Sequence, residues 1–194
     1  MAALCVLVGL ACGLVTAAHT TPLPLPDDHE RRLAAGEIIL LDTLPPGASR
    51  DAQGGTAVAL VRAPVETVWS ILVDYPGHPR FYPRLVSAEV LKASEGHALV
   101  RYVVAIGLLS FSFHMDKYQD ALRRRIEWQL ATGHSNSLFR ENSGYWQVDR
   151  RDGASLVTYA LAVRTVLPAF LTRAAERDSL VDTINGLRRL AERS

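Results

Sequence analysis

Hydrophobic positions along this chain follow a helical period first, a strand period next, and a helical period again at the end. The first helical stretch places four hydrophobic residues on one face, at the spacing i, i+3, i+4 and i+7: Val65, Val68, Trp69 and Leu72. A strand is predicted over residues 56–62, just before this helix. Pro64 suits the first helical turn, because its missing N–H would have no partner there. Residues 75–83, with prolines and aromatic residues, end the helix.

Between residues 85 and 165 hydrophobic residues alternate with polar ones, which is the period of strands with one buried face. Such strands are predicted over residues 85–92, 97–106, 110–120, 125–131, 144–150 and 155–165. Residues 132–142 are predicted to form a polar loop. The pair Asp152-Gly153, between the last two strands, is a strong hairpin signal. Short strands joined by tight turns predict one curved antiparallel sheet of six to seven strands.

The last helix is predicted from Pro168 to about Glu192. Its apolar face consists of Phe170, Ala174, Val181, Ile184 and Leu187. A long amphipathic helix that follows an antiparallel sheet needs a surface for that face, and the concave side of the sheet is the natural one. The residues alone therefore predict an α+β domain over residues 55–194, with the order strand, helix, curved sheet, helix.

The first residues read as a secretory signal. An apolar run from Leu4 to Val15 is too short to span a bilayer, and the small residues Thr16-Ala17-Ala18 follow it. A signal peptide is therefore predicted over residues 1–18, with export to the periplasm or the exterior. Cys12 lacks the large aliphatic residue three places earlier that lipidation favours, although lipidation there stays open.

A partly ordered leader or linker is predicted over residues 19–54. Alternating prolines at its start favour extended backbone. A short charged helix over residues 27–35 and a strand over residues 37–41 follow. Whether residues 27–50 pack on the domain stays open at this point.

Composition and charge narrow the classes of function. The chain has 194 residues, of which 48% are hydrophobic, so one domain with a sizeable core is expected. Its 21 basic and 20 acidic residues nearly cancel, which gives no general reason to expect nucleic-acid binding. Both cysteines, Cys5 and Cys12, lie in the predicted signal. The mature chain is therefore expected to lack disulfides, a thiolate nucleophile and a cysteine-based zinc site.

The best catalytic candidates are His114 and Asp116, which share one face of a predicted strand. Asp116 could orient His114 as a general base. Phe111, Phe113 and Met115 occupy the opposite face, so the pair faces solvent if the apolar face lines the interior. No nucleophile–base–orienter set, phosphate loop or metal-ligand set stands out in the sequence. No catalytic or metal-binding residue and no cofactor is predicted.

The stretch Ala-Pro-x-x-x-Val-Trp-x-x-Leu-x-Asp-Tyr, from Ala63 to Tyr75, resembles the opening of START-like (SRPBCC) domains. The closest likeness is to the polyketide cyclase/dehydrase and coenzyme Q-binding branch. Gly144-Tyr145-Trp146 and Thr158-Tyr159 resemble the same superfamily, and the resemblance covers about residues 55–190. It implies a helix-grip fold, in which the sheet wraps around the long C-terminal helix and encloses an apolar cavity, with short helices after the first strand.

The resemblance implies that the chain binds or carries a hydrophobic small molecule, such as a lipid, a quinone or a polyketide-like compound, without catalysis. Two alternatives stay open: an enzyme of the cyclase, aromatase or dehydratase type, and a protein-interaction module of the cell envelope. The expected partner is the hydrophobic ligand, with transient membrane contact allowed and no nucleic acid. The oligomeric state is not predicted.

The candidate ligand-binding residues are aromatic residues and arginines near the predicted cavity: Phe81, Tyr82, Arg101, Tyr102, Trp146, Tyr159, Arg173 and Arg177. Tyr102 and Tyr159 each combine an apolar ring with one hydroxyl group that can form a hydrogen bond. Trp146 matches a family tryptophan that follows a glycine on an inner strand. Phe81 and Tyr82 either cap an opening or pack inside a helix corner.

The three arginines have two interpretations each. Arg101 lies in an apolar strand, and it either fixes an acidic or carbonyl group of a ligand or points to water. Arg173 and Arg177 fall within the apolar stripe of the last helix. They either extend their charged heads to solvent or ring the cavity mouth and meet an anionic headgroup.

We predict that the mature protein begins near His19, because signal peptidase requires the small residues at positions 16–18. Mass spectrometry of exported material should give this N-terminus. Recovery of an intact Met1, or of a lipid on Cys12, would contradict the prediction.

Overall fold

The computed structural model describes residues 26–166 and 169–193, with side chains described up to residue 166 and again from Asp178. The predicted signal peptide with its two cysteines lies outside the described residues. So do the start of the predicted leader and the side chains of Phe170 and Ala174.

Twelve elements make up the described fold. In chain order they are α1 (Asp27–Ala34), β1 (Ile38–Leu41), β2 (Gln53–Val61), α2 (Val65–Val73), the 3-10 helix η1 (Tyr75–Arg80), β3 (Leu85–Ser94), β4 (His97–Ile106), β5 (Leu109–Asp120), β6 (Arg125–Leu130), β7 (Phe139–Arg151), β8 (Ala154–Thr165) and α3 (Ala169–Ala191).

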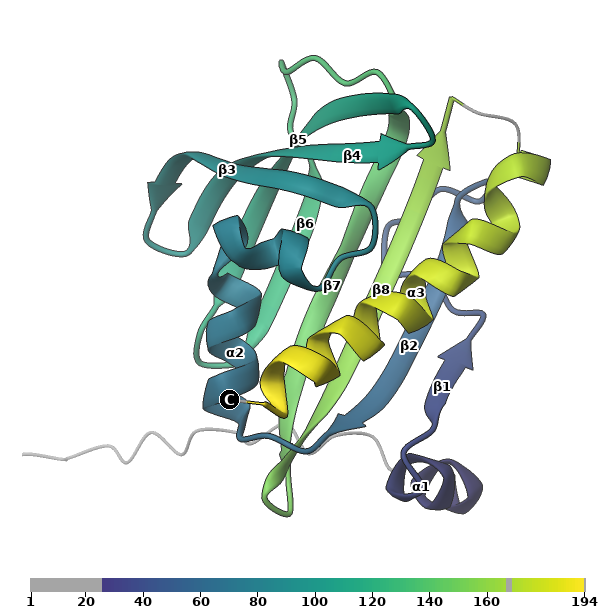
Figure 1. The fold of residues 1–194 in the computed structure, drawn as a ribbon, viewed down its shortest axis with the longest axis vertical. Coiled ribbons are helices and arrows are strands. Elements are labelled where there is room, and N and C mark those ends of the chain that lie inside the picture. Colours follow the sequence, from purple (N-terminus) through teal and green to yellow (C-terminus); the bar gives the residue numbers. More distant parts are fainter. Residues whose placement is uncertain (1–25, 167–168, 194) are drawn as a thin grey trace, which may run out of the picture.

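The eight strands form one sheet in the order β1-β2-β8-β7-β6-β5-β4-β3, with every neighbouring pair antiparallel. The sheet is strongly curved, and α3 lies diagonally across its concave face (Figure 1). The α2–η1 segment stands beside the C-terminal end of α3 (Figure 1). The predicted α+β helix-grip architecture is confirmed.

The sheet has eight strands instead of the predicted six to seven, because β1 joins it. Strand β1 pairs with β2 along its whole length, from Ile38 opposite Ala59 to Leu41 opposite Thr56. Residues 26–54 therefore pack on the domain, which settles the question that the sequence left open. The predicted short helix and strand of this segment are both present.

The predicted polar loop over residues 132–142 is wrong at its C-terminal end, because β7 begins at Phe139. Residues 139–142 pair with the end of β8, where Asn142 lies opposite Val163. Asn142 is polar in sequence but buried, and its side-chain oxygen accepts a hydrogen bond from Trp128 Nε1 at 3.1 Å. A buried amide is tolerated in a strand when it has such a partner.

Strand β2 is buried on both faces, which explains why its sequence does not alternate. Ala57, Ala59 and Val61 face the main core. Val58 faces the other way and packs with Leu33 of α1 in a second, smaller cluster. Helix α1 thus packs on the convex side of the sheet near β2, and Figure 1 shows it next to the start of β1.

Local sequence explains how the chain passes from α2 into η1. Val65, Val68 and Leu72 form the buried face of α2, and Pro64 is its N-cap residue. Asp74 ends the helix, and its side chain accepts a hydrogen bond from the Gly77 backbone N–H at 3.3 Å. This carboxylate takes the N-cap role for η1, which is a common use of aspartate.

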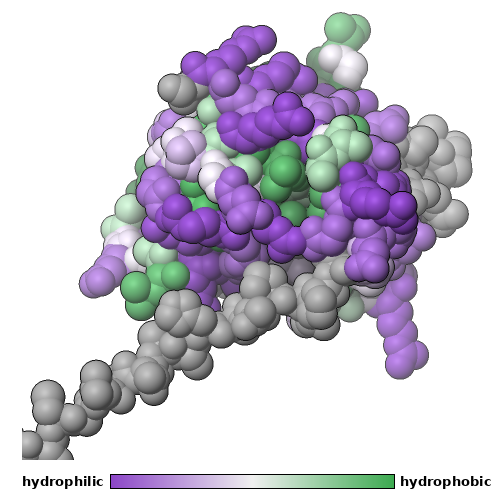
Figure 2. All heavy atoms as spheres, turned by 90° about the horizontal axis from the view of Figure 1, so that it is seen from below, coloured by the Kyte–Doolittle hydropathy of each residue, from purple (hydrophilic) through white to green (hydrophobic). Residues whose placement is uncertain are grey.

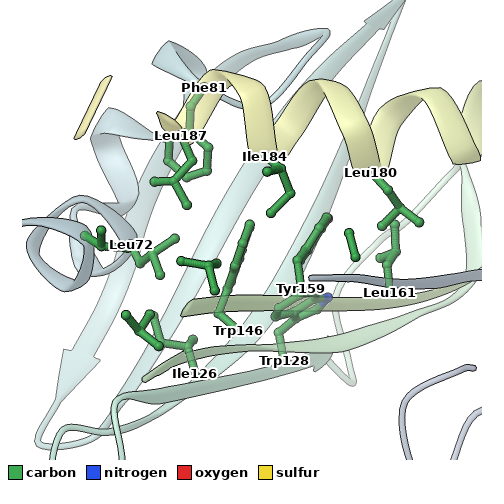
Figure 3. Packing of buried hydrophobic residues seen from close by; sticks show 14 of the residues in the cluster. Leu72, Phe81, Ile126, Trp128, Trp146, Tyr159, Leu161, Leu180, Ile184 and Leu187 are labelled. Carbon is green, nitrogen blue, oxygen red and sulfur yellow. The ribbon is translucent and has the colours of Figure 1, made fainter. Parts of the chain in front are cut away.

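The main core lies between α3 and the sheet. Leu180, Ile184 and Leu187 project from α3 toward Trp146 and Tyr159, whose rings rise from the sheet (Figure 3). Ile184, Leu187 and Trp146 are almost completely buried. The hydrophobic face that the sequence assigned to the last helix is therefore confirmed for Ile184 and Leu187, whereas Val181 is only partly buried and lies outside the core cluster.

One glycine determines how closely α3 approaches the segment after η1. A Cβ atom at Gly186 would lie 2.3 Å from the backbone oxygen of Phe81, far inside van der Waals contact. Because Gly186 has no side chain, the backbone after η1 can rest directly on α3.

We predict that Ile184→Ala lowers the free energy of unfolding by about 2–5 kcal/mol, because it leaves a cavity in a packed core. Chemical denaturation followed by tryptophan fluorescence measures this change. Leu122→Ala is the control, because Leu122 is exposed and should matter little. A loss below about 1 kcal/mol would show that Ile184 does not pack as the structure has it.

Candidate functional site

A cavity of about 270 Å³ lies between α3 and the part of the sheet formed by β4 to β8. The segment after η1 closes it on a further side. The residues that line it are Tyr82, Pro83, Arg84, Leu85, Tyr102, Val104, Ile106, Phe113, Met115, Lys117, Trp128, Leu138, Phe139, Asn142, Tyr159, Leu161, Val163, Thr165, Asp178, Ser179 and Asp182. Most of these side chains are aliphatic or aromatic, which is the usual lining of a small-molecule site.

The cavity has a polar outer end and an apolar interior. Arg84, Asp178 and Asp182 are exposed and line its outer part. Arg84 accepts a backbone hydrogen bond from Ala105 at 2.9 Å, which places this end beside the β4–β5 turn. The cavity therefore runs inward from the β4–β5 turn along the strands.

Tyr82 and Tyr159 form one wall of the interior, and Trp146 supports them from behind. The rings of Trp146 and Tyr159 stack with centroids 4.1 Å apart and planes 12° apart. Trp146 Nε1 donates a hydrogen bond to the Tyr82 hydroxyl at 2.7 Å. Burial raises the pKa of Tyr82 and of Tyr159 well above the usual tyrosine value, so both hydroxyls stay neutral. The wall is thus rigid and uncharged.

His78 of η1 lies behind this wall and fixes Tyr102 of β4. His78 Nε2 is 2.9 Å from the backbone oxygen of Leu72, and a carbonyl can only accept, so Nε2 carries the proton. His78 Nδ1 therefore accepts a hydrogen bond from the Tyr102 hydroxyl, at 3.0 Å. Burial lowers the pKa of His78 to about 3, with the positive charge of Lys117 contributing, so the ring stays neutral.

Lys117 of β5 is the most unusual residue in the cavity. Its side chain points into the interior and is only 4% exposed. Nζ lies 4.4 Å from the ring centroid of Trp128 and 5.4 Å from that of Tyr102. Among the side chains that the structure describes, no carboxylate forms an ion pair with it. Burial lowers the pKa of Lys117 to about 7.

The structure brings three of the candidate residues to the cavity surface: Tyr82, Tyr102 and Tyr159. Trp146 and Phe81 lie in the next layer. Trp146 supports Tyr82 and Tyr159 from behind, and Phe81 packs in the core against Trp146, with ring centroids 6.5 Å apart. Of the two interpretations of Phe81, packing inside the corner is therefore the one that the structure supports.

Arg101 is not part of the cavity. It lies on the outer face of β4, where its guanidinium approaches Glu89 of β3 at 3.5 Å and its side chain is 46% exposed. The alternation along β4 explains this position, because Val100 and Tyr102 on either side point inward. Arg173 and Arg177 lie outside the residues whose side chains are described.

His114 and Asp116 lie on the outer face of β5, as the alternation predicts. They do not act on each other: Asp116 accepts a hydrogen bond from His97 Nε2 at 2.9 Å, and His114 Nδ1 lies 3.2 Å from the Ser135 backbone oxygen. The hypothesis that Asp116 orients His114 as a general base is therefore wrong.

Within the described residues, no group of three histidine, cysteine, aspartate or glutamate side chains is arranged to hold a metal ion. In the same part of the chain, no helix is both long enough and apolar enough to cross a membrane.

Sequence reasoning missed Lys117, although the signal was present. Phe113 and Met115 were assigned to the inner face of their strand, and Lys117 is the next residue in that alternation. A lysine at the end of a strand usually points to solvent, so a charged residue at this position is not expected on the inner face even though the alternation places it there. The structure keeps it inward because β5 continues to Asp120, and Lys117 lies opposite Ala98 of β4 and Trp128 of β6.

Comparison with known proteins places this geometry in context. A family model described as "Polyketide cyclase / dehydrase and lipid transport" matches residues 61–188. No curated protein is significantly similar in sequence.

Several solved structures share the fold. A STAR-related lipid transfer protein from Xanthomonas axonopodis has 13% identity and a TM-score of 0.63, over 80% of this chain and 98% of that chain. A START superfamily protein from Mycobacterium smegmatis has 20% identity and a TM-score of 0.61, over 71% and 96%. The Zhui aromatase/cyclase from Streptomyces sp. R1128 has 20% identity and a TM-score of 0.59, over 71% and 92%. At these identities the likeness shows the fold alone.

We predict that Lys117→Met stabilises the protein at pH 7 and that this gain shrinks as the pH rises. The folded-state pKa is about 7, below the 10.5 of a free lysine, so the unfolded chain binds more protons across that window. The free energy of unfolding of the wild type should therefore rise by about 2 kcal/mol more than that of the variant between pH 7 and pH 9.

Chemical denaturation at both pH values measures the difference between the two proteins. Arg101→Met removes one positive charge from the outer face of the neighbouring strand and should show no such pH dependence. Parallel pH profiles for wild type and Lys117→Met would contradict the prediction.

Proposed function

Because the chain belongs to the polyketide cyclase / dehydrase and lipid transport family, we propose that it binds a hydrophobic small molecule in the cavity beneath α3 and releases it unchanged. The observation that carries this proposal is the apolar interior of the cavity. Its walls come from β4, β5, β6, β7 and β8, and polar groups are few and mostly paired with one another.

The dimensions of the cavity suit a small ligand. Its volume of about 270 Å³ is close to the lower end of the usual range for small-molecule pockets, roughly 300–1,000 Å³. Rigid aromatic walls reduce the entropy lost when a ligand binds. The proposed ligand classes remain a lipid, a quinone and a polyketide-like compound, all of which can place rings or chains against these walls.

Catalysis of the cyclase or aromatase type is the second candidate, and Lys117 is the observation that favours it. A desolvated amine near neutral pKa can act as a base or a nucleophile. The groups nearest to it are less suited to proton transfer, because Tyr102 donates to His78 and the pKa of His78 is about 3. The binding function therefore has the stronger support.

The interaction-module alternative has less support. Such a module would have a filled interior and a broad exposed hydrophobic patch. Among the described side chains, the exposed large hydrophobic residues are instead spread over several strands and turns: Val86, Leu91, Leu108, Leu109, Tyr118, Leu122 and Val166. Seen from below, the surface is mostly hydrophilic, with hydrophobic side chains showing in small areas between charged ones (Figure 2).

Export and transient membrane contact complete the proposal. Leu108 lies in the β4–β5 turn and Leu109 begins β5, opposite Ile106 of the cavity wall, and both leucines are exposed. Two leucines at the outer end of an apolar cavity suit a brief contact with a lipid surface during loading. The signal peptide that the sequence predicts would deliver the protein to the envelope or the exterior.

We predict that the wild type binds the neutral probe N-phenyl-1-naphthylamine with an increase in probe fluorescence, because the cavity offers it a dry aromatic site. Val104→Phe should weaken this binding by about tenfold or more, because the larger ring occupies the cavity. The matched control is Val103→Phe on the same strand, whose side chain points to the other face and is absent from the cavity lining.

His114→Ala should also bind normally, because His114 lies on the outer face. Absence of probe uptake by the wild type would contradict the proposed function. Equal affinities of Val104→Phe and Val103→Phe would show that the probe binds somewhere else.

A further inference from the structure

Lys117 gives the cavity a chemical preference that its apolar walls do not have. The other polar side chains that the structure describes in the inner cavity are neutral and already have a hydrogen-bond partner: Tyr82 with Trp146 and Tyr159, Tyr102 with His78, and Asn142 with Trp128. Lys117 has aromatic faces beside it and, among the described side chains, no carboxylate.

We infer that Lys117 is the anchor for the acidic group of an amphipathic ligand, and that the cavity takes hydrophobic carboxylates with the carboxylate innermost. This inference rests on the proposed binding function and names the class of ligand. It applies equally to a carboxylate on an aliphatic chain and to one on an aromatic ring.

The position of Lys117 along the strands sets the orientation of the ligand. The lining residues of β5 run inward from Phe113 through Met115 to Lys117, which is the one farthest from the β4–β5 turn. Ile106 of β4 and Thr165 of β8 lie at the outer end. A ligand that places its acid on Nζ therefore directs its apolar part past the aromatic walls toward the opening.

The energetics favour an anion over a neutral head at this position. A buried ammonium without a counter-charge is costly, and a carboxylate supplies that charge in a site of low dielectric. The amide of Asn142 lines the same interior, and its oxygen is occupied by Trp128, which leaves its nitrogen as the donor end. Lys117 and Asn142 together offer the two kinds of donor that a carboxylate accepts.

The charged and titratable groups around Lys117 do not compete for this role. Those that face the cavity are Tyr82 and Arg84 from the segment after η1, Tyr102 of β4, Tyr159 of β8, and Asp178 and Asp182 of α3, and His78 of η1 lies behind Tyr102. The histidine and the tyrosines stay neutral at pH 7, and the two carboxylates lie at the exposed outer end. Among the described residues, Lys117 is thus the one cation in the interior.

The experiment compares ligands that differ only in the head. Dodecanoate and dodecanol form an aliphatic pair, and 2-naphthoate and 2-naphthylmethanol form an aromatic pair. Isothermal titration at pH 7 should show that the wild type binds at least one carboxylate about tenfold or more tighter than its alcohol. Lys117→Met should abolish that preference while it still binds the alcohols.

Arg101→Met is the matched control, because it removes the same charge from the outer face of β4 and should keep the preference. A second readout is proton uptake at pH 8. The amine of the free protein is mostly neutral there, since its pKa is about 7, and a bound carboxylate should make it take up close to one proton. Titrations in two buffers of different ionisation enthalpy measure this uptake, which should be missing for the alcohols and for Lys117→Met.

The outcomes separate the inference from the proposed function. The inference is overturned if the wild type binds alcohol and carboxylate equally, or if Lys117→Met keeps the preference for the carboxylate. Either result would leave the binding function intact. Binding of neither member of either pair by the wild type would instead remove the proposed function. A preference for dodecanoate or for 2-naphthoate shows whether the ligand carries its carboxylate on an aliphatic chain or on an aromatic ring.

Discussion

An α-helix is about 10 Å wide and neighbouring strands lie about 4.8 Å apart, so one helix can cover little more than two strands. This width governs the rest of the structure. Helix α3 packs mainly on β2 and β8, and the strongly curved remainder of the sheet extends beyond its reach. Aromatic residues after η1 fill part of the uncovered space. The rest stays open as the cavity, which is therefore a consequence of the fold and needs no special sequence signal.

The periodicity of the sequence is enough to predict the elements and the side of the sheet on which α3 lies. It fails where burial contradicts polarity. Asn142 and Lys117 are polar residues that are buried. Asn142 accepts a hydrogen bond from Trp128 of β6, and Lys117 lies on the inner face of β5 between β4 and β6. Arg101 shows the converse error, since it was judged by its apolar neighbours and not by its parity along β4. Strict alternation would have placed both charged residues correctly.

The candidate site was predictable to the same extent. The tyrosines of the cavity follow from the alternation and from the family resemblance, but their partners do not. The hydrogen bonds from Tyr102 to His78 and from Trp146 to Tyr82 join segments far apart in the chain, and no spacing rule connects them. These bonds keep the polar atoms of the wall satisfied. The one inner group left without a described partner of opposite charge, Lys117, consequently dominates the electrostatics of the interior.

The two edges of the sheet have a consequence for solubility. An open edge strand presents unpaired N–H and C=O groups that can template another chain, and proteins limit this by short, bulged or charged edges. Here β1 has four residues. Strand β3, at the opposite edge, has two register shifts, near Val86 and Leu91, and carries Glu89 and Lys92. The small cluster of Leu33 and Ile39 fastens β1 over the nine-residue β2. The short segment before the main domain thus covers residues 56–59 of β2, whose backbone would otherwise be open to intermolecular strand addition.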